Sequence, residues 1–339
     1  MQTFWASIVV FGLLILFHEL GHFLVAKRVG IKVHEFSIGF GPKLIGLIRG
    51  ETVYSLRLLP LGGYVRMAGM DPAEEVDDEE RSFQKKPVYQ RAAVIAAGPA
   101  MNFLLAALLL AVIFMTQGVP TPTTTIGKLV PGQPAEKAGV LPGDRVVAIN
   151  DQPVDTWEQL SHLVNTHPGQ PLTLTVVRAG KERKIHLLTV ADPQGLGKIG
   201  IYPAQELRRL DPFSALGRGV EYTVRISVLI LDFIGKMITG QAPAELGGPV
   251  RIVQEINTAV KMGLFYLIQL AAFLSINLGL FNLLPVPALD GSRILFLAVE
   301  GLRGRPVDPA KENFIHLIGF GLLLLLIVVI TYKDIIQLM

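Results

Sequence analysis

The stretch Phe17-His18-Glu19-Leu20-Gly21-His22 lies inside an apolar segment over residues 4–26. Residues four apart share one face of a helix, so His18 and His22 can offer two imidazole nitrogens to one metal ion, with Glu19 beside them. An HExxH sequence alone is weak evidence, because soluble helices carry it by chance. Here it is surrounded by apolar residues, where three polar side chains are costly to bury and need a common partner. The stretch therefore predicts a zinc site within a membrane-spanning helix.

The whole chain has the composition of a membrane protein. Half of its 339 residues are hydrophobic, only 17% are charged, and its mean hydropathy is positive. The net charge of +3 comes without a basic tract that carries interleaved aromatic residues, so no nucleic-acid partner is expected. Because cysteine is absent, any zinc must be held by His, Asp or Glu.

Four apolar runs are long enough to cross a bilayer. We interpret the first as a retained span and not as a cleaved signal peptide, because it exceeds 20 residues and its basic pair, Lys27 and Arg28, follows it. The positive-inside rule then predicts that the N-terminus lies outside and that this helix runs inward. Basic residues after the third run predict a cytoplasmic loop there and an outside C-terminus. The other three runs cover residues 94–116, 264–289 and 315–332.

The segment between the first two spans combines glycine with alternating β-forming residues, which indicates short strands in a cytoplasmic hairpin region. A free strand edge beside the zinc helix could pair with an extended peptide, and a plain hairpin is an equal alternative. Residues 71–80 are mostly acidic and predict a solvated loop. In the second span, Asn102 either faces the site or hydrogen-bonds another helix.

After the second span, the sequence has the pattern of a water-soluble domain. A Pro/Thr linker over 119–125 precedes predicted strands at 126–130, 145–149, 172–177 and 183–190, with a helix at 156–166. This order and the phrase KAGVLPGDRVVAINDQPV resemble a bacterial, circularly permuted PDZ domain. The resemblance implies that residues 197–201 bind a peptide carboxy-terminus by strand addition. A β-domain that only restricts access to the membrane site is the alternative.

Residues 222–238 are apolar but carry Arg225, Asp232 and Lys236. If they crossed the membrane, the next span would deliver its C-terminal end to the wrong side. We therefore predict an amphipathic helix at the membrane interface.

The third span ends in the sequence NLLPVPALDG over residues 282–291, whose two prolines break the helix before Asp290. Asp290 and the HExxH box both lie near the cytoplasmic ends of their spans. A catalytic zinc uses three protein ligands and one open position, which His18, His22 and Asp290 would provide. Glu19 would act as the general base. The alternative for Asp290 is an ordinary turn after proline.

HELGH in the first span, a glycine-rich hairpin, GPAMNF in the second span, a PDZ-like insert and NLLPVPALDG resemble the site-two protease family of intramembrane metalloproteases, in its bacterial RseP-like group. The resemblance implies Zn²⁺ on His18, His22 and Asp290, catalytic Glu19, and a substrate backbone held by Asn282 and Asn277. It also implies regulated intramembrane proteolysis in the bacterial inner (plasma) membrane. The implied substrates are single-span proteins, either anti-sigma factors or remnant signal peptides. The chain departs from the two-PDZ form, since residues 121–203 leave room for one such domain.

The predicted architecture is a polytopic α-helical membrane protein with four transmembrane helices, a cytoplasmic membrane-associated β-hairpin region and an extracytoplasmic PDZ-like α+β domain. A non-catalytic PDZ-containing membrane scaffold is the first alternative function. A metal or proton transporter is the second, although the halves show no inverted repeat. The predicted segments are 1–29 (first span), 30–92 (hairpin and acidic loop), 93–118 (second span), 121–205 (PDZ-like domain), 206–262 (interfacial helices), 263–292 (third span), 293–314 (cytoplasmic loop) and 315–333 (fourth span).

Overall fold

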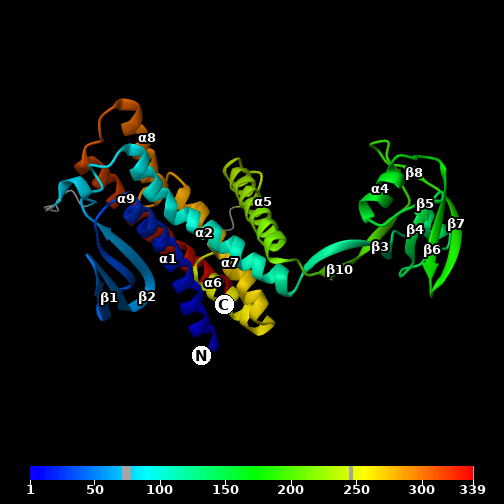
Figure 1. Cartoon of the computed structure of the whole chain (residues 1–339), viewed down its shortest axis with the longest axis horizontal. Coiled ribbons are helices and arrows are strands. Elements are labelled where there is room, and N and C mark those ends of the chain that lie inside the picture. The colour runs from blue at the N-terminus through cyan, green and yellow to red at the C-terminus, as the bar shows by residue number, and fades with distance from the viewer. Residues whose placement is uncertain (71–77, 244–246, 339) are drawn as a thin grey trace. The chain divides into compact units, whose positions relative to one another are not determined.

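Apolar helices and separate β-structures make up the computed structural model, which describes residues 1–70, 78–243 and 247–338 (Figure 1). The chain divides into two units, one formed by Met1–Ile113 with Asp211–Met339 and the other by Phe114–Leu210. Most of the predicted acidic loop, residues 71–77, lies outside the described residues, and Glu79–Arg81 form a short 3-10 helix.

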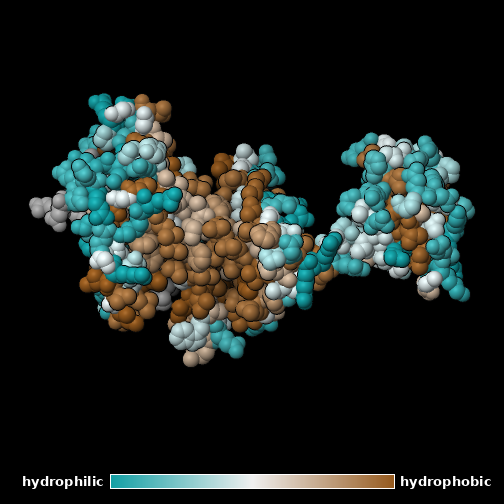
Figure 2. All heavy atoms as spheres, viewed as in Figure 1, coloured by the Kyte–Doolittle hydropathy of each residue, from teal (hydrophilic) through white to brown (hydrophobic). Residues whose placement is uncertain are grey.

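Four helices of the described chain are long and apolar enough to cross a membrane. At a rise of 1.5 Å per residue, even the 20 residues of the shortest reach about 30 Å, the thickness of the hydrocarbon core. Apolar side chains gather over the middle of the visible face of this helical unit (Figure 2), as a lipid environment requires. The four helices match the four predicted runs, although three of them begin two to six residues earlier than predicted and the third ends six residues earlier. They are α1 (Gln2–Arg28), α2 (Val88–Thr116), α7 (Leu264–Leu283) and α9 (Pro309–Leu338).

Helices α1 and α2 approach each other closely at Gly21, which is buried. A Cβ atom at this position would lie 2.2 Å from the Ala97 carbonyl oxygen, so the contact needs a residue without a side chain. Helix α7 packs on α1 through Val10, Leu14 and Ala271. The histidine-bearing turn of α1 is therefore held against α2 by close backbone packing.

Strands β1 (Val33–Arg49) and β2 (Thr52–Met67) form a long, bent hairpin. Ile38 pairs with both Leu56 and Gly63, so segments of the two strands pair more than once and residues 63–67 form one outer edge. The prediction of short strands was wrong. Repeated pairing extends both strands beyond the short lengths predicted, and Gly39 and Gly41 provide the left-handed φ angles at the bend.

The hairpin lies along α1 (Figure 1). Phe36 and Met67 share a buried cluster with Phe23 of α1. Gly63 of β2 lies close to the side chains of Ile15 and Glu19. The far part of the hairpin exposes a set of large apolar side chains. These are Phe40, Leu44, Ile45, Leu47, Ile48, Leu58 and Leu59.

The second unit contains one main sheet with the strand order β10-β3-β4-β6-β7. Helix α4 (Trp157–Asn165) begins with a capping box at Thr156 and buries Leu160 and Val164 in the core of this unit. The predicted strands and helix of the PDZ-like domain are confirmed. The sheet strands are β3 (Val119–Leu129), β4 (Arg145–Ile149), β6 (Pro171–Arg178), β7 (Lys181–Leu188) and β10 (Ile201–Arg208). Shorter elements are α3 (Pro134–Lys137), β5 (Gln152–Pro153), β8 (Val190–Ala191) and β9 (Gly197–Lys198).

The predicted linker at residues 119–125 is instead the first half of β3. Thr121 pairs with Glu206 and Pro122 with Gln205, so β10 turns this Thr-rich stretch into a strand. Threonine favours extended backbone, and proline is tolerated where a strand needs no hydrogen bond from its nitrogen. The prediction failed because the partner strand is about 80 residues away in sequence.

Three further helices complete the helical unit: α5 (Pro212–Ile238), α6 (Pro249–Met262) and α8 (Asp290–Arg303). Helix α5 begins at its Asp211 cap and buries a narrow stripe of Ala215, Gly219 and Thr223, while its other faces are largely exposed. It contains the predicted amphipathic helix of residues 222–238 but begins ten residues earlier, and its place at an interface remains a prediction.

The buried ion pair of Asp144 gives the second unit a pH-dependent stability. Asp144 has a 1% exposed side chain and accepts hydrogen bonds from Arg178 Nε and Nη2 at 2.6 and 2.7 Å. These bonds hold the pKa of the Asp144 carboxyl below its usual range. The stabilisation is therefore complete above the unfolded-state pKa of about 3.9 and is lost as pH falls through the lower folded-state pKa.

We expect Asp144→Ala to destabilise this unit by about 3 kcal/mol at neutral pH, because it leaves Arg178 without its buried partner. Trp157 fluorescence during urea unfolding, in a Trp5→Phe background, measures the change. Asp151→Asn is the control, since that carboxylate is 77% exposed in its pair with Lys184 and asparagine tolerates the left-handed φ of 63° at this position, so stability should change little. Equal losses in the two variants would contradict the assignment.

Candidate metal centre

Helix α1 presents His18, Glu19 and His22 on adjoining turns. The two imidazole rings lie 4.9 Å apart in an edge-to-face arrangement, and their Nε2 atoms are 3.3 Å apart. His22 is buried and His18 is partly buried. The i, i+4 spacing therefore brings two ring nitrogens to one point, as the sequence predicted.

Asp290 reaches the same point from the other end of the sequence. Helix α7 ends at Leu283, the proline-containing segment follows, and Asp290 is the first residue of α8. Its Oδ2 atom lies 3.1 Å from His18 Nε2 and 3.4 Å from His22 Nε2. The sequence prediction that these residues converge is confirmed by this geometry.

The three atoms fit a tetrahedral metal site. At a bond length of about 2.05 Å, two ligands of a tetrahedral zinc ion lie about 3.3 Å apart. The three separations of 3.1, 3.3 and 3.4 Å match this value. In addition, Asp290 Oδ2 is buried without a hydrogen-bond partner within the described chain. A metal ion would satisfy this atom, which is otherwise costly to bury.

The second nitrogen of each histidine also has a partner. His22 Nδ1 donates to the Val94 carbonyl oxygen at 2.8 Å, which leaves the Nε2 lone pair free. His18 Nδ1 lies 3.1 Å from Asn102 Nδ2. Both partners belong to α2, so Asn102 faces the site, one of its two predicted alternatives. The sequence gives no sign of Val94, because a backbone carbonyl is common to every residue.

Glu19 lies beside the three ligand atoms and not among them. The backbone N–H of Val65 in β2 lies close to its carboxyl group. A cavity of about 280 Å³ opens in front of Glu19, His18 and His22. Other residues of its wall are Tyr64, Val65, Met67, Met70, Ile95 and Arg293.

A charged network on the hairpin holds the cavity wall in place. Glu35 accepts from Ser55 and from Arg57 Nη2, the latter at 2.8 Å, and the Arg57 guanidinium lies 5.4 Å from the centre of the Tyr64 ring. Burial raises the pKa of Glu35, but the hydrogen bonds from Ser55, Arg57 and Tyr64 outweigh it and bring that pKa to about 2. Glu35 therefore stays ionised at neutral pH and keeps Arg57 beside Tyr64.

Asn277 and Asn282 lie outside the lining of this cavity. Asn277 Nδ2 donates to the Phe273 carbonyl oxygen within α7 at 2.9 Å. Their predicted substrate contacts remain predictions.

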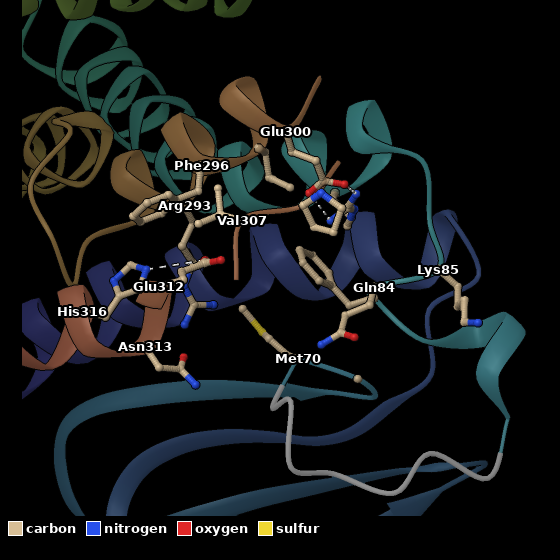
Figure 3. Close-up of a pocket in the computed structure, with 15 residues that line it drawn as sticks. Met70, Gln84, Lys85, Arg293, Phe296, Glu300, Val307, Glu312, Asn313 and His316 are labelled. Atoms are coloured by element: carbon tan, nitrogen blue, oxygen red, sulfur yellow. Dashed lines mark hydrogen bonds and ion pairs between the residues drawn. The ribbon is translucent and has the colours of Figure 1, made fainter. Parts of the chain in front are cut away.

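A second cavity of about 310 Å³ adjoins the first (Figure 3). Met70 and Arg293 line both cavities. His316 of α9 lies at this cavity, where its Nδ1 accepts from the Ala288 N–H at 3.0 Å and its Nε2 is 3.7 Å from Glu312. Ala288 has a left-handed φ of 75° two residues before Asp290, so α9 helps to fix the loop that delivers this ligand. The polar His316 at the start of an apolar run was a signal that the sequence interpretation missed.

Gly98 lets α2 pass directly over His22. A Cβ atom there would lie 2.3 Å from His22 Nε2. We expect Gly98→Ala to lower zinc affinity by at least about tenfold, because the ring must move or α1 and α2 must separate. Gly12→Ala is the control, since a Cβ atom on that glycine of α1 meets no atom within 4 Å. Chelator competition measures both affinities, and an unchanged Gly98→Ala value would contradict the close approach.

The chain is similar to known proteins over nearly its whole length. Residues 6–326 match the profile of peptidase family M50. The chain is 37% identical to the zinc metalloprotease RasP of Geobacillus kaustophilus, over 99% of this chain and 98% of the relative. It is 36% identical to the regulator of sigma-W protease RasP of Bacillus subtilis, over 98% of each chain. Among solved structures, the PDZ domain of an SdrC-like protein from Listeria monocytogenes matches 24% of this chain and 88% of its own, with 15% identity and a TM-score of 0.22.

Proposed function

Since the chain belongs to peptidase family M50 and is a zinc metalloprotease of the RasP and RseP type, we propose that it is an intramembrane endopeptidase that cleaves the transmembrane segments of single-span proteins. The observation that carries the proposal is the convergence of His18, His22 and Asp290, with Glu19 beside them, between helices apolar enough to cross a membrane. A polar cluster at such a position is costly unless it serves a function.

His18, His22 and Asp290 are the zinc ligands in this proposal. Their three separations and the unpartnered Asp290 oxygen support the assignment. Bound there, zinc supplies a Lewis acid that polarises the scissile carbonyl and makes water more acidic.

Glu19 is the general base. Its carboxyl group lies close to the Val65 N–H, and both residues line the cavity. Glu19 accepts the proton of the attacking water and then donates it to the nitrogen of the leaving amine. The same residue therefore takes up and releases the proton, which explains why the site needs a carboxylate that does not bind the metal.

The hairpin presents the substrate in an extended form. A helical substrate engages its carbonyls in i to i−4 hydrogen bonds, so its backbone must unwind before hydrolysis. Residues 63–67 form an edge of the hairpin, and Tyr64, Val65 and Met67 line the cavity. A peptide added to this edge would lie beside Glu19. The exposed apolar residues of the hairpin support its insertion into the bilayer.

The second unit binds a peptide carboxy-terminus. A cavity of about 360 Å³ there is lined by residues 197–201 and by apolar residues of α4 such as Trp157 and Leu160. This combination suits an apolar terminal residue with its carboxylate at backbone N–H groups. A domain that only restricts access is the alternative, and an affinity that is equal for peptides with free and amidated termini would favour it.

The biological substrates in this proposal are anti-sigma factors or remnant signal peptides in the bacterial inner membrane. The name of the Bacillus subtilis relative, regulator of sigma-W protease, supports the first class. Basic residues at the inner ends of the spans support extracytoplasmic termini and an extracytoplasmic PDZ-like domain.

Metal removal tests the proposal. Purified protein in proteoliposomes should cleave a single-span reporter, lose this activity after treatment with a chelator, and recover it when zinc is added. Mass spectrometry of the products should place the cut inside the apolar segment of the reporter. A cut only in a soluble tail would contradict intramembrane cleavage. Cleavage that persists without zinc would contradict the metal site, and partner binding without any cleavage would favour the scaffold.

A further inference from the structure

Asn102 is an amide at the centre of an apolar helix with no access to solvent, since its relative exposure is 0%. Its Nδ2 atom lies 3.1 Å from His18 Nδ1, while its Oδ1 is buried without a hydrogen-bond partner within the described chain. Such an unpaired buried oxygen is costly. A 180° turn of the amide would place Oδ1, in place of Nδ2, against His18 Nδ1.

The hydrogen-bond chemistry of His18 links this orientation to the metal. An NH₂ group can only donate, so opposite Asn102 Nδ2 the His18 Nδ1 atom must accept and its proton must sit on Nε2. Nε2 is the atom that faces His22 and Asp290, and a protonated nitrogen cannot bind a metal ion. His22 has the opposite arrangement, because its Nδ1 faces a carbonyl.

We propose that Asn102 is a positioning residue for the metal ligand His18. For His18 Nε2 to bind a metal ion, the amide must present Oδ1 and accept the Nδ1–H of His18. Both histidines then donate Nδ1–H to an oxygen atom of α2, as His22 does to the Val94 carbonyl. The inference rests on the proposed ligand set and extends it to a third element, α2.

The side chain and the backbone of Asn102 make different contacts, so they can be tested separately. Ser275 Oγ of α7 donates to the Asn102 carbonyl oxygen at 2.8 Å, so the contact between these helices uses the backbone. Replacing the side chain leaves this hydrogen bond intact. An effect of substitution on zinc can thus be traced to the amide.

Zinc affinity of the detergent-solubilised full chain, measured by chelator competition, tests the inference. Asn102→Leu has a similar shape but cannot accept a hydrogen bond, and we expect its affinity to fall by about 10–100-fold. Asn102→Asp can accept but cannot donate, and we expect it to bind zinc at least about tenfold more tightly than the Leu variant. The absorption spectrum of the Co²⁺-substituted protein should change in the Leu variant and stay close to wild type in the Asp variant.

Asn257→Leu is the matched control, since the Asn257 amide also joins another helix to α1, through Thr3 at 2.9 Å. Its zinc affinity should not change. Wild-type affinity in Asn102→Leu, or equal losses in the Leu and Asp variants, would overturn the inference. If Asn102→Leu does not fold, Asn102→Ala takes its place under the same criteria. A wild-type protein that binds no zinc would overturn the ligand set itself, and so the proposed function.

Discussion

Glu19→Gln should bind zinc as the wild type does and lose peptide-bond hydrolysis by about 10²–10⁴-fold, the usual contribution of a general base. The amide has the shape of the carboxylate but cannot take a proton from water. The three ligand atoms come from His18, His22 and Asp290, so the metal site should stay intact. Single-turnover cleavage of a single-span reporter, with zinc content measured on the same sample, tests both parts.

The control for this variant is Glu221→Gln, which makes the same chemical change at an exposed position of α5. It should retain wild-type cleavage. If Glu19→Gln cleaved at the wild-type rate, Glu19 would not be the base. If it lost zinc as well as activity, its role would be structural, and the proton would have to pass through another group.

Asp290→Ala should lose zinc itself. The substitution removes one of three ligand atoms, and its cost should exceed the 10–100-fold loss typical of outer-shell partners. It also leaves His18 and His22 facing each other at 3.3 Å with no carboxylate between them. Zinc content after dialysis and the dissociation constant from chelator competition measure the loss.

Asp334→Asn controls for the loss of a buried carboxylate. Asp334 is 6% exposed in α9 and accepts hydrogen bonds from the N–H groups of Gly248 and Arg251, away from the metal cluster. This variant should lose stability but keep zinc. An Asp290→Ala protein with wild-type zinc affinity would show that Asp290 is only a turn residue, the alternative that its Pro-rich context allows.

Local patterns in the sequence determined the parts of the site that depend on short-range geometry. The spacing of His18 and His22 fixes their common helix face, and Pro285 and Pro287 end α7 before Asp290. Apolar run length determined the four long helices, and basic residues suggested that the two motifs lie at one depth. These signals are readable because each arises within a few turns of one chain segment.

Tertiary structure alone decided which groups complete the site. Several of these groups belong to the backbone and cannot be inferred from residue types. They are the Val94 carbonyl, the Val65 N–H and the left-handed Ala288, whose N–H hydrogen-bonds His316. The bent hairpin beside α1 and the strand at residues 119–125 depend on partners that are distant in the sequence. Asn102 depends on both the sequence and the tertiary structure. The sequence reveals a polar residue within an apolar run, but the contact with His18 exists only because glycines let α1 and α2 approach each other. Periodicity is a property of one segment, whereas a hydrogen bond between segments depends on how closely they pack.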